Sequence, residues 1–406
     1  MSTKQTDIIV SGAGIAGLAL SILLARVGLQ VALIDPADKK VLSNDAPSGR
    51  SVALMNSSLN VLKAAGVWPS LKQISGQLQT MRLMDISHGD PITEPFEAHD
   101  IGEEQFGYNV PNNALRAALY QVANQEDKIT FYLERRFEGY VAGDGGVSVR
   151  LDDKNEIQSK LLIGADGRSS VVRKCAGIEA STHRYQQSAL TFLINHSKSH
   201  ENISTEFHRP EGPLALVPLP GNQCSVVWVN SHERCEELLR LKKQELEDVL
   251  AHETHDVLGG LTLESSVESW PLCSIKAKSL TAPRVALVAE AAHVMSPITA
   301  QGLNLSLRDI AALSEVIVDA ARVGQDIGAR TVLRSYEKRR NFDIDTRYYG
   351  VDGFMRLVSN DIAAIKDFRR TGLKGLSHLP SFKNIAMRVG LAPSFDSGRL
   401  VQGEGL

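Results

Sequence analysis

The sequence predicts an α/β fold, in which a parallel sheet flanked by helices is interleaved with a β-rich domain and followed by a helical C-terminal segment. Three observations predict it. The first 35 residues alternate strand, glycine-rich turn, helix and strand. Two later apolar strands, near 161 and 284, each run into a turn that carries one acid. The segment 181–269 breaks into short apolar runs separated by Pro and Gly, a pattern typical of strands.

The amino-terminal unit starts with a short apolar strand, 7–10, and Gly28 ends the helix that follows the turn. In such a unit the first glycine permits the tight turn, the second lets a pyrophosphate approach, and the third lets helix and strand pack closely. The N–H groups at the helix start face the phosphates, and an acid after the second strand accepts from a ribose. The alternative is a glycine turn that only packs. The pattern therefore predicts a dinucleotide site at Gly12, Ala13, Gly14, Ile15, Ala16, Gly17 and Asp35.

The second motif, 161–173, is an apolar strand, a turn that holds Asp166 beside Gly167, and the start of a helix. Ser169 or Ser170 is placed to cap that helix. Two interpretations stay open: the acid belongs to a simple capped helix, or the turn lies against the cofactor.

The third motif, 284–304, is an apolar strand that ends at Glu290 and leads to a long helix after Gly302. A helix N-terminus offers about half a positive charge and free N–H donors, which suit an anionic ligand. His293 follows the strand. We expect His293 to have a structural role, hydrogen-bonded to backbone, rather than a catalytic one.

Together the three motifs resemble the flavin-dependent aromatic hydroxylases of the para-hydroxybenzoate hydroxylase class, and most closely the ubiquinone-biosynthesis hydroxylases (UbiH, UbiF and VisC type). The resemblance covers nearly the whole chain. Residues 161–173 match the pattern G-A-D-G-x-x-S-x-V-R, and 49–54, 65–68 and 213–220 also match. The third motif departs from the common G-D-A-A-H…G-Q-G-x-N-x-G at Ala289, Glu290, Ala300 and Ser306.

This resemblance implies a glutathione-reductase-like, FAD-binding Rossmann domain formed by 1–75, 100–180 and 270–340. It implies a β-rich substrate domain formed by 76–99 and 181–269, and a C-terminal helical segment, 341–406. Beyond the first turn, it implies FAD contacts at Arg50, Ser51, Asn112, Arg116, Asp166, Gly167, Glu290, Pro297, Gln301, Gly302, Leu303 and Asn304.

The resemblance also implies hydroxylation of a polyprenylated phenol in ubiquinone biosynthesis, through a flavin hydroperoxide formed from NAD(P)H and O₂. The cofactor does the difficult step, so no protein nucleophile is needed and no catalytic residue is assigned. No second G-x-G-x-x-G is present for NAD(P)H, so NAD(P)H binds transiently or another reductant serves. The alternatives are another flavin monooxygenase or reductase acting on a different apolar substrate, or a non-catalytic prenyl-binding chaperone.

Composition excludes several classes. A net charge of −3 gives no overall attraction to nucleic acid. The four cysteines lack C-x-x-C spacing, so we expect no metal site and a reduced, cytoplasmic setting. The segment 366–388 mixes Lys and Arg with apolar residues. Either it is a packing helix with a solvated face, or it contacts the inner membrane or a ubiquinone-biosynthesis complex peripherally.

Overall fold

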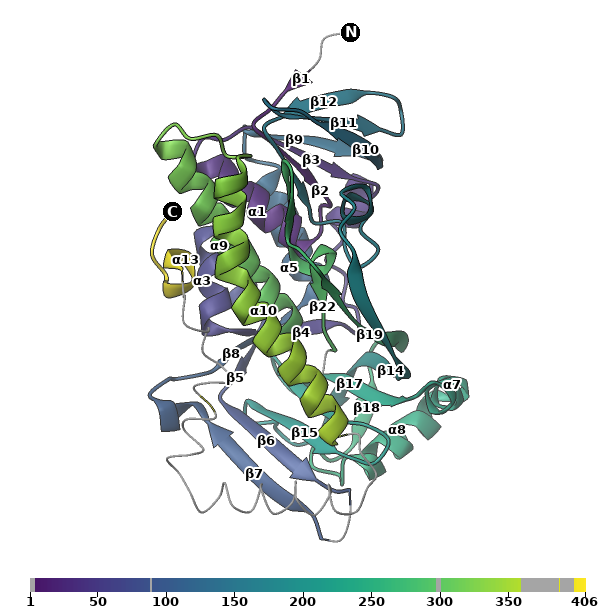
Figure 1. Ribbon diagram of the computed structural model, residues 1–406. Coiled ribbons are helices and arrows are strands. Elements are labelled where there is room, and N and C mark those ends of the chain that lie inside the picture. Colours follow the sequence, from purple (N-terminus) through teal and green to yellow (C-terminus); the bar gives the residue numbers. More distant parts are fainter. Residues whose placement is uncertain (1–3, 88–89, 297–300, 359–386, 388–397) are drawn as a thin grey trace.

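The computed structural model describes residues 4–87, 90–296, 301–358, 387 and 398–406, with backbone only for 351–358 (Figure 1). None of the helices in these ranges has the length and apolar character needed to cross a bilayer. The predicted α/β fold is confirmed, since helices pack around a largely parallel sheet in the first part of the chain.

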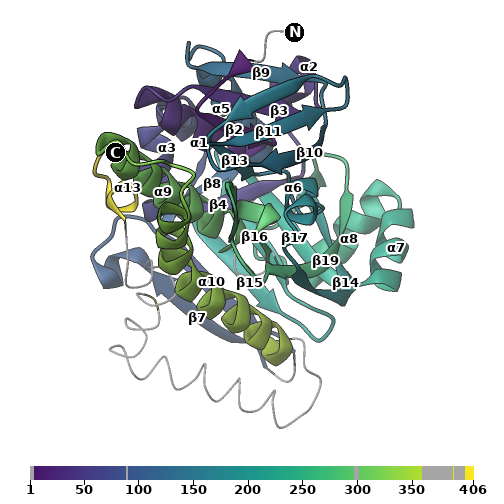
Figure 2. The same cartoon turned by 45° about the horizontal axis from the view of Figure 1, so that its top comes forward.

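The six-stranded sheet forms the first core. Its order is β20 (Thr281–Ala282), β21 (Val285–Leu287), β13 (Leu161–Gly164), β2 (Ile8–Ser11), β3 (Val31–Asp35) and β9 (Ile129–Leu133). All pairs are parallel except β20 with β21. The central strands are apolar and buried on both faces, which is why they read as continuous hydrophobic runs. Figure 2 shows β2, β3 and β13 side by side.

Helices and a small sheet complete this domain. The helices packed around it are α1 (Ile15–Arg26), α5 (Asn112–Ala123) and α9 (Gln301–Arg322). The outer four-stranded sheet is β1 (Lys4–Gln5), β12 (Glu156–Ser159), β11 (Val147–Leu151) and β10 (Phe137–Ala142). Short helices are α2 (Lys39–Leu42), α3 (Asn56–Ala64), α4 (Trp68–Leu71), α6 (Val171–Cys175) and the 3₁₀ turns η1 (Lys72–Ile74), η2 (Ala98–Ile101) and η3 (Ala289–Ala291).

The second, β-rich sheet lies below the first in Figure 1. Its order is β22 (His293–Val294), β19 (Glu268–Ala277), β14 (Ala180–His196), β17 (Gln223–Ser231), β16 (Leu214–Leu219), β15 (Ile203–His208), β6 (Thr80–Asp85) and β7 (Ile92–Glu97), and β18 (Leu261–Leu263) pairs with β14. Segments far apart in sequence meet where β6 pairs in parallel with β15. One face is covered by α7 (His232–Arg240) and α8 (Lys243–Glu253) around a separate apolar core.

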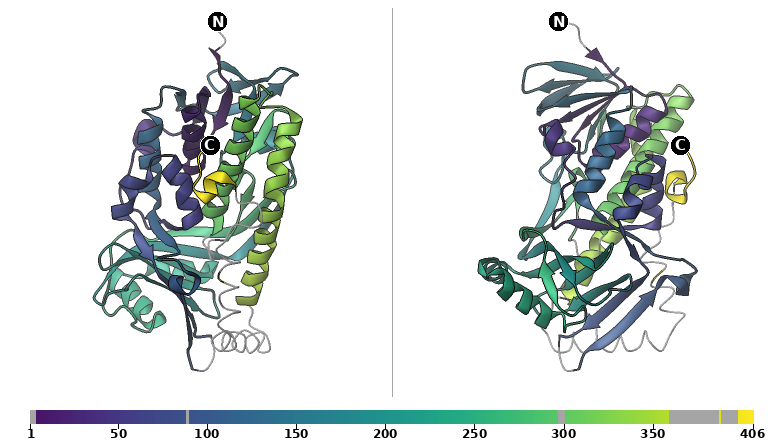
Figure 3. Two further views of the ribbon diagram at one scale, coloured as in Figure 1. Left: turned by 90° about the vertical axis from the view of Figure 1, so that its left-hand side faces the viewer. Right: turned by 180° about the vertical axis from the view of Figure 1, so that it is seen from behind.

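Two features join the sheets. A three-stranded sheet, β4 (Ser51–Met55), β8 (Gly107–Pro111) and β5 (Gly76–Leu78), lies between them. The long helix α10 (Arg330–Val358) runs beside α9 toward the β-rich sheet, as Figures 1 and 3 both show. The C-terminal α13 (Arg399–Gln402) packs on α3 and α9. Residues 359–386 and 388–397 lie outside the described ranges, and with them nearly all of 366–388.

Candidate cofactor site

The three predicted motifs meet at one edge of the six-stranded sheet. In register, Ser11 of β2 pairs with Gly164 of β13, and Gly164 pairs with Leu287 of β21. The Ala165 N–H donates to Ser11 O (2.8 Å), and the Val288 N–H donates to Gly164 O (3.0 Å). Because the carboxyl ends of parallel strands share an edge, the turns that follow all three strands lie together.

The glycines of the first turn have different environments. Gly12 has φ +109°, and a Cβ there would lie 2.3 Å from Ala165 O. A Cβ at Gly17 would lie 1.8 Å from Gly12 O, so helix and turn touch through backbone. A Cβ at Gly14 would meet nothing within 4 Å, and no side chain caps α1. Uncapped N–H groups with open space beside them fit a bound phosphate.

Asp35, at the end of β3, holds the first turn in place. Its carboxylate accepts from the Ala13 N–H (2.6 Å) and the Ala37 N–H (2.7 Å). The side chain is half-buried. Each carboxylate oxygen keeps a further lone pair, so a ribose contact is compatible with these bonds and stays a prediction.

Asp166 acts as a helix cap. One carboxylate oxygen accepts from Ser170 Oγ (2.5 Å), and the other accepts from the Val171 and Val172 N–H groups (2.7 and 3.0 Å). Asp166 therefore caps the helix, as the first of the two interpretations expects. Gly167 has φ +77° and open space where a Cβ would stand. A cofactor contact at this turn stays a prediction, and the turn itself lies against Gly12.

The Arg50 corner links the two sheets. The Asn112 N–H donates to Arg50 O (3.1 Å), which ties β4 to the start of α5. The Arg50 guanidinium lies over the Trp270 ring, 4.5 Å from its centroid. The neighbouring Ser51 Oγ donates to Ser225 Oγ (2.6 Å). Trp270 and Ser225 carry no sequence motif, so nothing in the pattern identifies them.

Two buried polar atoms at the start of α5 lack partners. Asn112 Oδ1 and Arg116 Nε are both buried and make no hydrogen bond within the described part of the chain, while Arg116 Nη2 donates to Asn44 O (3.5 Å). They lie four residues apart, so they share one helix face. Leaving such an atom unpaired costs about 1–3 kcal/mol, more for a charged group. A bound polar group would remove this cost, so this pair of one acceptor and one donor fits the predicted cofactor.

Glu290 contacts the turn that follows β13, which carries Arg168. It pairs with Arg168, Nε to carboxylate 3.6 Å, and both side chains are half-buried. The preceding Ala289 has φ +56°, a left-handed conformation that favours glycine. This explains why the common pattern has Gly there. A ribityl contact by Glu290 stays a prediction.

At the start of α9, two residues are engaged by protein and one is open. Gln301 Oε1 accepts from Arg347 Nη1 (2.9 Å). Asn304 accepts from the Met55 N–H (2.9 Å) and donates to Ala53 O (2.8 Å), so it holds β4. A Cβ at Gly302 would meet no atom of the described residues within 4 Å. Leu303 packs against the main core, and Pro297 lies outside the described residues.

His293 has a structural partner, but not the predicted one. Its Nε2 hydrogen-bonds the Asp309 carboxylate at 2.6 Å, and both side chains are buried. The expected backbone partner is therefore wrong. Asp309 also accepts from the Ala289 N–H (3.0 Å) and from Arg340 Nε (2.8 Å). The pair thus fixes the loop after β21 to α9 and α10.

The Asp309 contacts continue into a buried ion network, which we define as His293, Arg308, Asp309, Arg340, Asp343 and Arg347. Asp343 pairs with Arg340 (2.8 Å), Arg347 (2.9 Å) and Arg308 (3.3 Å). Burial alone raises the pKa of Asp343, but the three arginines outweigh it and hold that pKa far below its usual range. Burial lowers the pKa of Arg308 to about 9.

The network bears on the site through its charge and its position. Among the described residues the network holds three arginines and two aspartates, and Arg347 and Arg308 both reach Gln301 at the start of α9. The helix N-terminus adds to that potential. Both effects favour an anionic group at this point. The α10 members were not identified from sequence, because they lie outside every motif.

Comparison with known proteins identifies the family. The FAD binding domain family matches residues 5–343. The ubiquinone hydroxylase UbiL of Rhodospirillum rubrum is 33% identical over 385 residues, covering 95% of this chain and 89% of that protein. The 3-demethoxyubiquinol 3-hydroxylase of Escherichia coli is 29% identical over 392 residues, covering 96% and 100%.

Solved structures show the same fold. PqsL of Pseudomonas aeruginosa, described as a probable FAD-dependent monooxygenase, superposes with a TM-score of 0.74 at 21% identity, covering 92% of this chain and all of that one. The p-nitrophenol 4-monooxygenase PnpA of Pseudomonas putida gives 0.77 at 15% identity, covering 98% and 100%. The resemblance to the ubiquinone-biosynthesis hydroxylases is thus confirmed, and the chain belongs to the FAD-binding monooxygenase family.

Proposed function

We propose that this protein is an FAD-dependent hydroxylase that oxygenates a polyprenylated phenol in ubiquinone biosynthesis. One observation carries the proposal: the turns of the three motifs meet at one sheet edge, where the start of α1 is uncapped and Gly14 leaves open space. The unpaired Asn112 and Arg116 atoms lie on α5, which packs against α1. The names of the relatives support the substrate class.

In this proposal the chain binds and orients, and FAD when bound supplies the redox chemistry that activates O₂. The uncapped start of α1 holds the phosphates, and Asn112 and Arg116 supply one acceptor and one donor. The start of α9 and the two arginines that bond Gln301 stabilise negative charge on the bound group. The face of the β-rich sheet that carries Ser225 covers the site and excludes water.

NAD(P)H is the proposed reductant. The single glycine fingerprint of the chain is assigned to FAD, so NAD(P)H would bind only transiently. Comparing NADH with NADPH in stopped-flow reduction of the bound flavin tests this. A reductant-specific rate supports the proposal, and reduction only by a protein electron donor contradicts it.

The lipid-soluble substrate suggests a peripheral place at the inner membrane for a protein of the cytoplasm. The sequence of 366–388 supports this, although its residues lie almost wholly outside the described ranges. Liposome sedimentation with the intact chain and a chain shortened before 366 tests it. Loss of binding in the shortened chain is expected, and equal binding contradicts the idea.

Metabolite analysis of a deletion strain tests the reaction itself. An accumulated polyprenylphenol that lacks one hydroxyl is expected, and restored quinone on complementation. Normal quinone without such an intermediate contradicts the substrate assignment. Purified protein without flavin absorbance would instead favour the prenyl-binding chaperone alternative, and flavin without phenol-stimulated NAD(P)H oxidation would favour another flavin reaction.

A further inference from the structure

A cavity of about 320 Å³ lies in the β-rich sheet, and it opens on the face that turns away from the cofactor edge. The two faces are distinguished by their contacts. Thr191 and Ser225 share one face and reach Trp270 and Ser51. Phe192 and Leu216, alternate in their strands, share the other face and belong to the core under α7 and α8. The cavity belongs to this second face, because Leu216 lines it.

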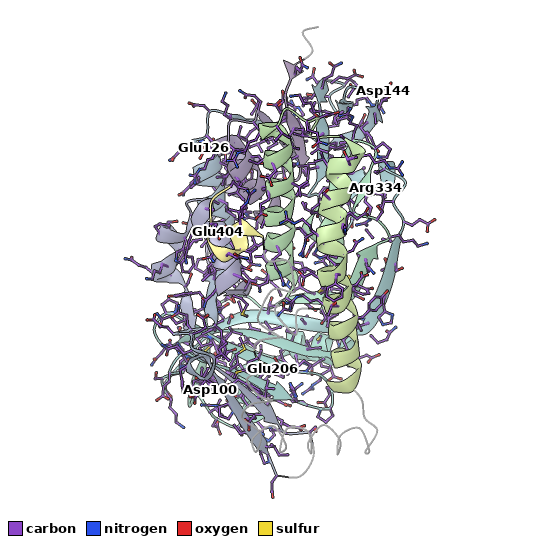
Figure 4. The ribbon with its side chains drawn as sticks, turned by 60° about the vertical axis from the view of Figure 1, so that its left-hand side comes forward. Asp100, Glu126, Asp144, Glu206, Arg334 and Glu404 are labelled. Carbon is purple, nitrogen blue, oxygen red and sulfur yellow. The ribbon has the colours of Figure 1, made fainter. Side chains whose placement is uncertain are left out.

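The floor of the cavity is a row across three strands. Arg82 of β6 pairs in register with Thr205 of β15, and Thr205 pairs with Leu216 of β16. Register partners point to the same face of a sheet, so these three side chains lie in line. Glu206, the neighbour of Thr205, marks β15 in Figure 4. The walls are the loop 198–201 and the residues Val257 and Leu258 that follow α8.

Two polar groups in this row have no partner in the described part of the chain. The Arg82 guanidinium is half-buried and makes no hydrogen bond or ion pair there. The Thr205 hydroxyl is equally unpaired, although the residue is only 4% exposed. A nearby imidazole shows the contrast, since His200 bonds Leu219 O (2.9 Å) and the Asn202 N–H (3.0 Å).

The composition of the lining selects the ligand. Arg82 is fixed on a strand, and Lys198 stands at the exposed rim. Glu201 is the one acid of the lining, also exposed, so the cavity disfavours cations. A guanidinium beside a hydroxyl matches a planar carboxylate. The rest of the lining is apolar, and a bare inorganic anion would leave this surface uncovered. The apolar residues are Ile203, Leu216, Val257 and Leu258.

We infer that this cavity binds a small organic carboxylate with a compact apolar body, at a site separate from the flavin. The carboxylate pairs with Arg82 and accepts from the Thr205 hydroxyl, while the body packs on Leu216 and Leu258. A volume of this size suits a ligand of one ring. The inference does not depend on the hydroxylation reaction.

Isothermal titration calorimetry of the full, FAD-loaded chain with benzoate tests the site. We expect one weak site, and a loss of affinity of about tenfold or more in Arg82→Gln, since a charged hydrogen bond is removed. Thr205→Val should lose less. Arg136→Gln, a change at an exposed arginine of the other domain, is the matched control and should bind as wild type does. Thermal melts confirm that each variant is folded.

Two comparison ligands test whether the site requires both the carboxylate and the apolar ring. Benzyl alcohol, which has the same ring without the charge, should bind more weakly than benzoate, and so should inorganic phosphate. Any one of three results overturns the inference. Arg82→Gln binds benzoate as tightly as the wild type does, phosphate binds as tightly as benzoate, or benzyl alcohol binds as tightly as benzoate. Benzoate that is insensitive to Arg82→Gln but displaced by an aromatic substrate occupies the flavin face instead.

Discussion

The start of α5 and the contact of α9 with α10 treat buried polar groups in opposite ways. Along α9 and α10, the buried arginines and aspartates all find partners within 3.3 Å. At the start of α5, Asn112 Oδ1 and Arg116 Nε find none among the described residues. The ion pairs of the first region are complete as protein alone, whereas these two atoms of the second region leave room for a polar ligand.

The largest effect is expected from breaking the scaffold. Asp309→Asn removes the charge that Arg340 and His293 face, and an uncompensated buried ion costs about 3–5 kcal/mol. Urea unfolding of the FAD-free chain measures it. Asp319→Asn, at an exposed pair with Arg399, is the control and should cost under about 1 kcal/mol. Similar losses in both variants would contradict the comparison.

The next effect is a pH dependence of the same scaffold. The pKa values of Asp309 and Asp343 are lower in the folded chain, because neighbouring arginines and His293 outweigh burial. The stability they contribute is therefore fully present above the unfolded pKa, about 3.9, and is lost as pH falls through the folded pKa. Urea midpoints from pH 6 downward should fall more steeply below about pH 4 in wild type than in Asp343→Asn. Parallel curves would show that Asp343 does not contribute.

Arg116→Met should separate site from scaffold. Arg116 Nε has no partner among the described residues, and Nη2 makes only a long bond to Asn44 O (3.5 Å), so the substitution should leave the FAD-free stability nearly unchanged, while FAD affinity falls about ten- to hundredfold. Fluorescence titration of the stripped protein with FAD measures the second effect. Arg150→Gln, an exposed arginine of the same domain, should change neither quantity. A destabilised Arg116→Met with normal FAD binding would assign Arg116 to the scaffold.

The last comparison concerns two glycines of one turn. Gly14 has φ −72° and open space, so Gly14→Ala should stabilise the FAD-free chain by about 0.4–1 kcal/mol and weaken FAD binding. Gly17→Ala meets Gly12 O and should destabilise by about 1–3 kcal/mol with or without FAD. Thermal melts with and without FAD distinguish them. Equal behaviour would remove the assignment of phosphate space to Gly14.

What the sequence predicts well is local. The three turns follow from short runs of residues, because strand, turn and helix signals lie within about 15 positions of one another. Their meeting at one edge follows from parallel pairing. Contacts between distant segments leave no such signal. The pairing of β6 with β15 and the partner of His293 depend on tertiary packing, and Arg340 and Asp343 read as an ordinary charged helix.

Asn304 is expected at the cofactor, and in the structure its amide also bonds the backbone of β4, accepting from the Met55 N–H and donating to Ala53 O. That strand starts directly after Arg50, whose guanidinium stacks over the ring of Trp270 in the β-rich sheet. The Asn304 side chain thereby sets the spacing between the start of α9 and β4. Loss of flavin from an Asn304 variant would therefore reflect a displaced β4 as well as any lost contact between the amide and the flavin.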